Sequence, residues 1–314
     1  MTMDIADEAR LSGGALEKLL RAGHFVVTSE TTPPLSADPA TLLTNVAPLR
    51  GVADAVNVTD GAGARSHMSS LAAAALLARE GIEPVLQLTL RDRNRLALQN
   101  DLLGAAALGV ANVMCLHGDD VAGGDQPDAK MVHDLDSAGL IALACSMRDE
   151  GRLPSGREIA LPPALVVGAA DTPSEPGPDW SPVALERKLA AGASFFQTQF
   201  CFDADMLRRY MARLADEGIT ERAWFLIGIG ALRSAKSARW MTDNLFGVHI
   251  PETTIARLDD ASDPREEGLA ICVELLEALP DIPGVSGAHV MGPGAEAAAA
   301  EAIRDAGIRE RRAA

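Results

Sequence analysis

Basic residues are scarce in this sequence, which has 28 Lys and Arg against 44 Asp and Glu and a formal net charge of −16. Binding to a nucleic-acid backbone requires a basic surface, so this balance argues against a nucleic-acid partner. It does not exclude a small anionic ligand, because a few local Arg and Lys side chains can bind one.

Cysteine is scarce as well. The chain has only 4 cysteines, widely spaced and without a CxxC pair. Neither a disulfide framework nor a typical zinc site has this spacing. We therefore expect reduced thiols, no bound metal and a cytoplasmic protein.

Long uninterrupted apolar runs are missing too. The longest uncharged stretch of note, 102–118, is broken by Gly104 and Gly109 and is followed by Asp119. A transmembrane helix needs about 20 apolar residues in a row. The first ten residues are acidic and lack the basic start and apolar centre of a signal peptide. These absences predict no membrane partner and a soluble protein with a small-molecule ligand.

The sequence does contain a regular alternation of β-branched runs with Ala- and Leu-rich segments of helical period. Strands are expected at about 25–30, 55–60, 84–89, 112–117, 164–170, 195–200, 225–230 and 287–292. The intervening helices include 66–80, 93–108 and 203–217. Most of these strands are apolar on both faces, as parallel strands covered by helices are.

Eight strand–helix units without a break predict an α/β fold, a (β/α)8 TIM barrel in a single domain over residues 1–314. Residues 1–20 are expected to form an N-terminal helical extension. A doubly wound sheet is the alternative, but its G-x-G-x-x-G motif is missing, and Gly61-Ala62-Gly63 is only a weak match. Walker A, H-E-x-x-H and G-x-S-x-G motifs are absent as well.

A barrel carries its catalytic groups at the C-terminal ends of its strands. The polar positions there are Glu30, Thr59, Asp60, Gln87, Thr89, His117, Gly118, Asp119, Asp120, Asp171, Gln197 and Gln199. Polarity confined to one end of the strands is typical of an active-site mouth.

Glu30 lies in "VVTSETTPP", where two prolines stiffen the chain just after it. The acid could face solvent in a turn. Alternatively, shielding from water raises its pKa and suits it to act as a general acid near neutral pH.

Two further stretches leave alternatives open. The run 116–120 is either a polar turn or a place where Gly118 lets a ligand approach the backbone. Gln197 and Gln199 alternate, so their amides are predicted to point to one face, where they serve a heterocycle or form a satisfied polar cluster.

Other charged and aromatic features favour structural roles. The run 91–95 (RDRNR) is expected to be a solvated helix start, and His289, like most of the histidines, shows no ligand spacing. The irregular stretch 171–180 is a candidate lid or binding loop, in which Trp180 more often packs than stacks on a ligand.

Six segments, in this order, together resemble one family. They are "SETTPP", "NVTDGAGA", "VLQLTLRDRNRLALQNDLLGAAALG", "CLHGDD", "ERKLAAGASFFQTQFCFD" and "GIGALRSAKSARWM". The set is similar to methylenetetrahydrofolate reductase, in the short bacterial form that has only the catalytic domain. The resemblance runs from about residue 20 to 305.

The resemblance implies a barrel that holds FAD and reversibly reduces 5,10-methylenetetrahydrofolate to 5-methyltetrahydrofolate with NADH or NADPH, in a ping-pong cycle. By position, Glu30 matches the general acid. Asp119 matches an aspartate that contacts the pterin and favours the cationic intermediate. Gln199 matches a glutamine that hydrogen-bonds the pterin, with Gln197 as a further substrate-binding candidate.

The same resemblance implies cofactor-binding positions. Thr59, Gly118, Ala169 and Lys188 match flavin contacts, and Gln87 and His117 stand where many members have a His and an Arg. Together with Thr31-Thr32, which replaces an aromatic pair, these departures leave FMN or no flavin open as alternatives to FAD. Direct hydride transfer from NADH and a non-redox pterin-binding methyltransferase or folate-binding barrel are the rival functions. A homo-oligomer is left open.

Overall fold

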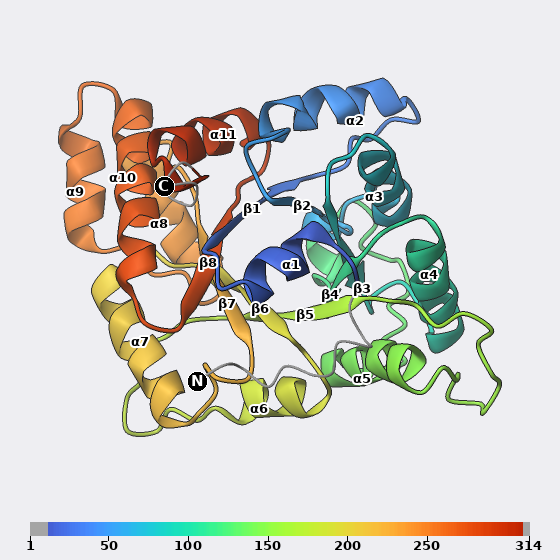
Figure 1. Ribbon diagram of the computed structural model, residues 1–314. Helices are drawn as coiled ribbons and strands as arrows, with labels where there is room; N and C mark the ends of the chain where they lie inside the picture. Colours follow the sequence, from blue (N-terminus) through green and yellow to red (C-terminus); the bar gives the residue numbers. More distant parts are fainter. Residues whose placement is uncertain (1–11, 310–314) are drawn as a thin grey trace.

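The computed structural model describes residues 12–309, and its centre is a closed barrel of eight parallel strands in sequence order (Figure 1). The strands are β1 (Val26–Thr31), β2 (Ala55–Val58), β3 (Pro84–Thr89), β4 (Asn112–Leu116), β5 (Val166–Asp171), β6 (Phe195–Phe200), β7 (Trp224–Ile229) and β8 (Val285–Val290). Strand β8 pairs with β1 and closes the cylinder. The predicted (β/α)8 barrel is confirmed.

Helices surround the barrel. They are α2 (Pro39–Val46), α3 (Ser70–Arg79), α4 (Arg95–Ala107), α5 (Ser137–Asp149), α6 (Val183–Ala190), α7 (Ala204–Asp216), α8 (Ala235–Asn244), α9 (Glu252–Asp260), α10 (Pro264–Ala278) and α11 (Glu296–Asp305). Several begin at an Asp or Asn whose side chain accepts a backbone N–H, as Asp38, Asn94 and Asp203 do for α2, α4 and α7. Each predicted helix is present, shortened at both ends by such caps and turns.

The predicted strands lie within two residues of the observed ones. The largest differences, of two residues each, are β2, which ends at Val58, β5, which begins at Val166, and β8, which begins at Val285. Strand β2 ends early because Gly61 turns the chain with a φ of +63°. Strand β8 begins earlier than predicted because Val285 already pairs with Phe225, ahead of an irregularity in the register of the two strands.

Two apolar layers bury the two faces of the strands. One lies between barrel and helices and includes Val27, Val167 and Phe196. The other fills the barrel interior and includes Val26, Val166 and Phe195. Successive strand residues therefore alternate between the layers, and this explains why the strands are apolar on both faces.

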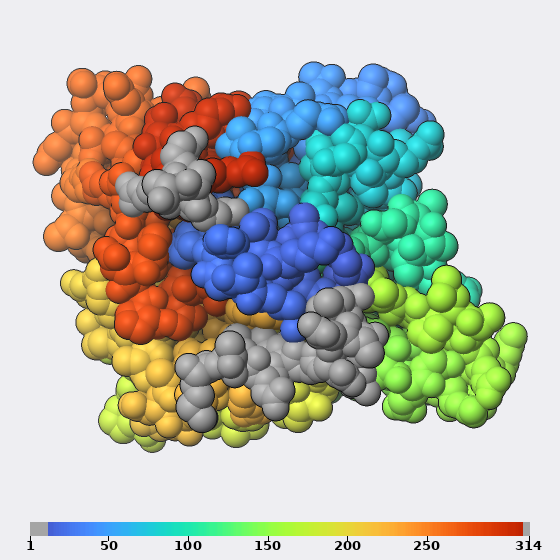
Figure 2. Space-filling view, in the orientation of Figure 1, coloured from blue at the N-terminus to red at the C-terminus, as the bar shows by residue number. Residues whose placement is uncertain are grey.

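Helix α1 (Ala15–Arg21) closes the N-terminal end of the barrel. Its Leu16 and Leu20 are buried in the interior layer, together with Phe195 and Trp224. Figure 2 shows this helix in blue, lying over the end of the barrel that faces the viewer. Of the predicted extension 1–20, residues 1–11 lie outside the described residues. Within 12–309, no helix has the length and apolarity needed to cross a membrane.

Candidate active site

Glu30 lies near the C-terminal end of β1, one residue before the strand ends. Its Oε1 accepts a hydrogen bond of 3.2 Å from the backbone N–H of Gly292, in the loop after β8. Its Oε2 lies 3.9 Å from Nε2 of His289, and the side chain is 16% exposed. The acid is thus held by one hydrogen bond at the mouth of the barrel, lies beside His289 and still reaches solvent.

This environment changes the proton affinity of Glu30. Burial raises its pKa to about 7, the Gly292 N–H opposes the rise, and the nearby Glu296 adds to it. Burial also lowers the pKa of His289 to about 3, so this imidazole is neutral. A carboxyl with a pKa near 7 exchanges its proton readily at neutral pH, as a general acid must.

A chain of buried polar side chains continues from Glu30 into the barrel. His289 Nδ1 lies 2.9 Å from Thr28 Oγ1, and the Gln197 amide donates to Thr28 Oγ1 at 3.1 Å. Gln197 and Asn57 exchange two amide hydrogen bonds of 2.5 and 3.0 Å. Polar groups replace the branched apolar residues usual inside such barrels, and each has a partner.

The two glutamines of β6 differ in their surroundings. Gln197 is 1% exposed and its amide is fully used by Asn57 and Thr28. Gln199 is partly exposed, and its Oε1 accepts the N–H of Phe200. A β-bulge between Gln197 and Phe200 interrupts the alternation that predicts one common face. A substrate contact by either glutamine stays a prediction.

Arg91 organises the loops after β2 and β4. It is 4% exposed, and its Nη1 donates to the carbonyls of Gly61 and Asp119. Gly118, with φ +91°, packs so tightly that an added Cβ would lie 2.8 Å from Arg91 Cβ. The predicted unusual backbone angle of Gly118 is confirmed, but here it makes room for Arg91. The Asp119 carboxylate accepts the N–H of Gly63 at 2.7 Å, which joins the two loops.

Arg93 forms a partly buried ion pair that its place in a charge run does not indicate. Its guanidinium donates to both carboxylate oxygens of Asp60, and Thr89 also donates to Asp60. Burial raises the pKa of Asp60, but the hydrogen bonds from Arg93 and Thr89 outweigh it and lower the pKa overall. The prediction of a solvated helix start is therefore wrong for Arg91 and Arg93. The groups that bury them, the carbonyls of Gly61 and Asp119 for Arg91 and the carboxylate of Asp60 for Arg93, lie about 30 residues away, so the charge run itself gave no signal.

The remaining cofactor-binding candidates lie near the C-terminal ends of the strands and differ in how deeply their side chains are buried. Lys188, on α6, donates to the carbonyl of Ala170 at 2.5 Å, and burial lowers its pKa while Asp171 opposes this. The side chain of Ala169 is buried in the helix-facing layer, whereas Ala170 packs against the interior layer. The hydroxyl of Thr59 donates to that of Thr32.

His117 and Gln87 are the last two of the predicted cofactor-binding residues. The His117 ring stacks on His133 at 4.2 Å between ring centroids, and its Nδ1 lies 3.1 Å from the Gly118 carbonyl. Nε2 of His133 is buried without a partner among residues 12–309. Gln87 is partly buried on β3, and its amide has no hydrogen-bond partner in that same range.

The irregular stretch after β5 packs against the protein. Trp180 lies edge-on to Tyr210 with ring centroids 5.8 Å apart, and the Arg213 guanidinium lies 5.7 Å from the Trp180 ring. The Tyr210 hydroxyl donates to Asp171 at 2.8 Å. Trp180 is thus a packing residue in this structure.

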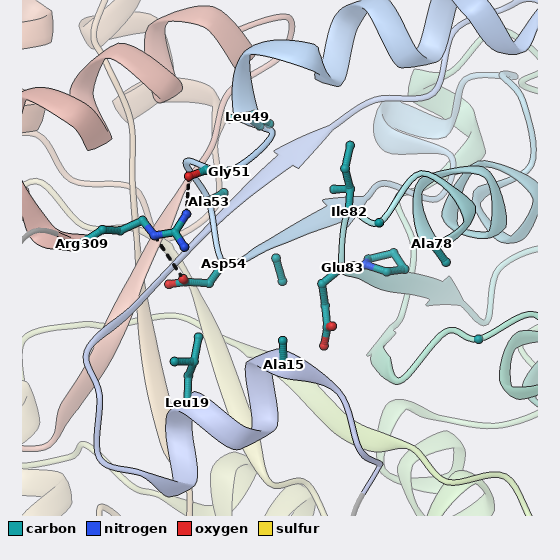
Figure 3. A pocket seen from close by; sticks show the side chains of 14 residues that line it. Ala15, Leu19, Leu49, Gly51, Ala53, Asp54, Ala78, Ile82, Glu83 and Arg309 are labelled. Carbon is teal, nitrogen blue, oxygen red and sulfur yellow. Dashed lines mark hydrogen bonds and ion pairs between the residues drawn. The ribbon is translucent and has the colours of Figure 1, made fainter. Parts of the chain in front are cut away.

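A cavity of about 380 Å³ lies at the opposite, N-terminal end of the barrel (Figure 3). It is lined by α1, by the residues just before β2 and β3, and by Arg309, which contacts Gly51 and Asp54. Glu30 and the other predicted site residues lie at the other end of the strands. Across the described part of the chain, no cluster of three or more His, Cys, Asp or Glu side chains is placed to hold a metal ion.

The fold and this arrangement define a class: a (β/α)8-barrel enzyme whose protonatable carboxyl and polar side chains gather at the C-terminal ends of the strands. The chain belongs to the methylenetetrahydrofolate reductase family, whose sequence profile matches residues 15–307. The family resemblance inferred from the six segments is confirmed, and with it an oxidoreductase-type role in folate chemistry.

Solved structures share the fold at low sequence identity. An uncharacterized protein from Clostridium thermocellum that binds two copies of 5-methyl-5,6,7,8-tetrahydrofolic acid superposes with a TM-score of 0.61 and 14% identity, covering 94% of this chain and 100% of its own. DmoA from Hyphomicrobium sulfonivorans superposes with a TM-score of 0.54 and 11% sequence identity, covering 92% of this chain and 88% of its own. No curated protein sequence matches the chain significantly.

Proposed function

We propose that the protein catalyses the reversible reduction of 5,10-methylenetetrahydrofolate to 5-methyltetrahydrofolate with NADH or NADPH. The observation that carries the proposal is Glu30, a carboxyl at the barrel mouth with a pKa near 7. Family membership supports the reaction class. The folate bound by the C. thermocellum protein supports the substrate.

The overall reaction consumes a hydride and a proton. As the methylene bridge opens, the bond from its carbon to N10 breaks, and Glu30 supplies the proton that N10 gains. The resulting 5-iminium carbon accepts the hydride and becomes the methyl group. Glu30 is left as a carboxylate, held by the Gly292 N–H, until it takes up a proton from water.

Asp119 and Gln199 are proposed to hold the pterin. Asp119 carries negative charge at the mouth, where it favours the cationic iminium electrostatically. The Gln199 amide is partly exposed and retains its N–H donors for the edge of a heterocycle, since only its oxygen is used by Phe200.

The residues present fit a flavin, FAD or FMN. The Gln87 amide and the buried Nε2 of His133 lack partners among residues 12–309, and the Lys188 ammonium uses one hydrogen on Ala170. These groups, with Thr59 and the backbone at Gly118 and Ala169, would hold the cofactor, with Lys188 and His117 on its phosphate or ribityl side. When bound, a flavin supplies a two-electron carrier between the nicotinamide and the folate.

Two measurements on the purified protein test the proposal. A flavin spectrum that bleaches with NADH and recovers with methylenetetrahydrofolate is the expected result. Glu30→Gln is expected to abolish the folate step and to leave bleaching by NADH largely intact. A colourless protein that oxidises NADH with the folate would indicate direct hydride transfer. A protein that binds folate but oxidises no NADH would refute the reductase assignment and indicate the non-redox alternative.

A further inference from the structure

His289 lies next to the proposed acid, but the sequence shows no ligand spacing around it. Its ring is buried inside the barrel, between Thr28 on one side and Glu30 on the other. A buried imidazole that stays neutral carries one proton, on either Nδ1 or Nε2. Which nitrogen holds the proton decides what His289 offers to Glu30.

The hydrogen-bond chain behind His289 favours one tautomer. The Gln197 amide has two hydrogens, and it donates one to Asn57 Oδ1 and the other to Thr28 Oγ1. Because Thr28 accepts from Gln197, its own hydrogen is free to point elsewhere. His289 Nδ1 lies 2.9 Å away and the Ala288 carbonyl 3.3 Å away. The hydroxyl can donate to the carbonyl or to Nδ1; the shorter contact favours Nδ1, and in that arrangement the imidazole proton lies on Nε2.

Nε2 is the nitrogen that faces Glu30, at 3.9 Å from Oε2. This separation is too long for a hydrogen bond, and a side-chain movement of roughly 1 Å would close it. The other charged group near the acid is Glu296 of α11, which accepts from Thr31 and repels a carboxylate at Glu30. Against that repulsion, the ionised acid has the Gly292 N–H and the nearby Nε2–H as donors.

We propose that His289 is a positioning residue for Glu30, locked by Thr28 in the Nε2–H tautomer so that a neutral donor faces the carboxylate left after proton transfer. Neutrality matters because an imidazolium at this distance would hold Glu30 ionised and leave it without a proton to give. The donor matters because a carboxylate formed away from water needs hydrogen bonds. This role rests on the proposed function, whereas the coupling between the two side chains does not.

Two amide variants separate the role from simple packing. In His289→Gln the amide extends far enough to place an N–H near the position of Nε2. In His289→Asn the amide is one methylene shorter, so it reaches Thr28 and falls short of Glu30. Both substitutions bury an amide on the same strand position and differ only in its reach, and thermal unfolding of each checks that the barrel is intact.

The readout is the titration of Glu30, followed by 13C NMR of carboxyl-labelled glutamate and assigned with Glu30→Gln. His289→Asn is expected to raise the pKa of Glu30 by about one unit, a tenfold change in proton affinity. His289→Gln is expected to keep the wild-type value. Equal shifts in the two variants would refute the proposal.

15N NMR of the wild-type protein measures the protonation state and tautomer of His289 directly, without a variant. The expected spectrum shows His289 neutral and protonated on Nε2 from pH 5 to 9. A proton on Nδ1, or an imidazolium that titrates near pH 6.5, would overturn the proposal. In the folate step at pH 7, His289→Asn should be about tenfold slower than His289→Gln. A protein that shows the coupling but reduces no folate would refute the proposed function and leave the coupling established.

Discussion

Replacing Glu30 by Gln should stabilise the protein in mildly alkaline solution. The pKa of Glu30 rises from 4.5 to about 7 on folding, because burial disfavours its charged form. The folded protein therefore holds a proton that the unfolded chain releases between these two pH values. The stability that the protonated Glu30 contributes is fully present below pH 4.5 and is lost as the pH rises through about 7.

The size of the effect follows from the shift. A pKa that rises from 4.5 to about 7, at about 1.4 kcal/mol for each unit, gives an upper limit of about 3.5 kcal/mol. Between pH 5 and pH 8 the ionising carboxyl should cost the wild-type protein about 2 to 3 kcal/mol. Gln keeps the shape of the side chain and an oxygen for the Gly292 N–H, but it never ionises.

Urea unfolding of the wild type, Glu30→Gln and the exposed control Glu221→Gln, each at pH 5 and pH 8, measures this difference. We expect the advantage of Glu30→Gln over the wild type to grow by about 2 to 3 kcal/mol between the two pH values. The control should show little change. If the advantage did not grow with pH, the pKa of Glu30 would not be raised in the folded protein, and the main support for its role as a general acid would be lost.

Three other substitutions test the packing around the site and the barrel. Arg93→Leu should cost about 3–5 kcal/mol in urea unfolding, because it leaves Asp60 buried without its cation; a cost near zero would show that the pair is dispensable. Gly118→Ala should lower stability by more than Gly109→Ala, since both have positive φ but only Gly118 has a close neighbour for the new Cβ; equal losses would mean that contact with Arg91 is relieved at no cost. Leu16→Ala should cost about 2–5 kcal/mol by opening a cavity at the N-terminal end of the barrel, measured as a lower unfolding midpoint.

The architecture could be predicted because each strand is a short apolar run bounded by polar residues. The position of Glu30 followed from the same regularity, since a barrel places every strand end at one rim. The polar chain behind it could have been found in part. Thr28, Asn57, Gln197 and His289 are polar residues inside otherwise apolar runs, on the interior side of the alternation.

Other features depend on contacts between distant segments. Whether Arg91 is solvated or buried is decided by loops 30 residues away, and the sequence around it is the same in both cases. The space beside Gly118 is likewise filled by Arg91, a side chain from the loop after β3. The β-bulge in β6 arises from pairing with β7, so the orientation of Gln199 could not be read from alternation alone.

The helix that closes the N-terminal end of the barrel also bears on where the acid can exchange its proton. With Leu16 and Leu20 sealing that end, the interior defined by residues 12–309 opens toward the C-terminal ends of the strands. Under the proposed function, a folate bound there would cover Glu30 and separate it from bulk water. The protonation state would then be fixed at the moment of binding, so pH should act on kcat/KM, and the acid must be recharged between product release and the next encounter.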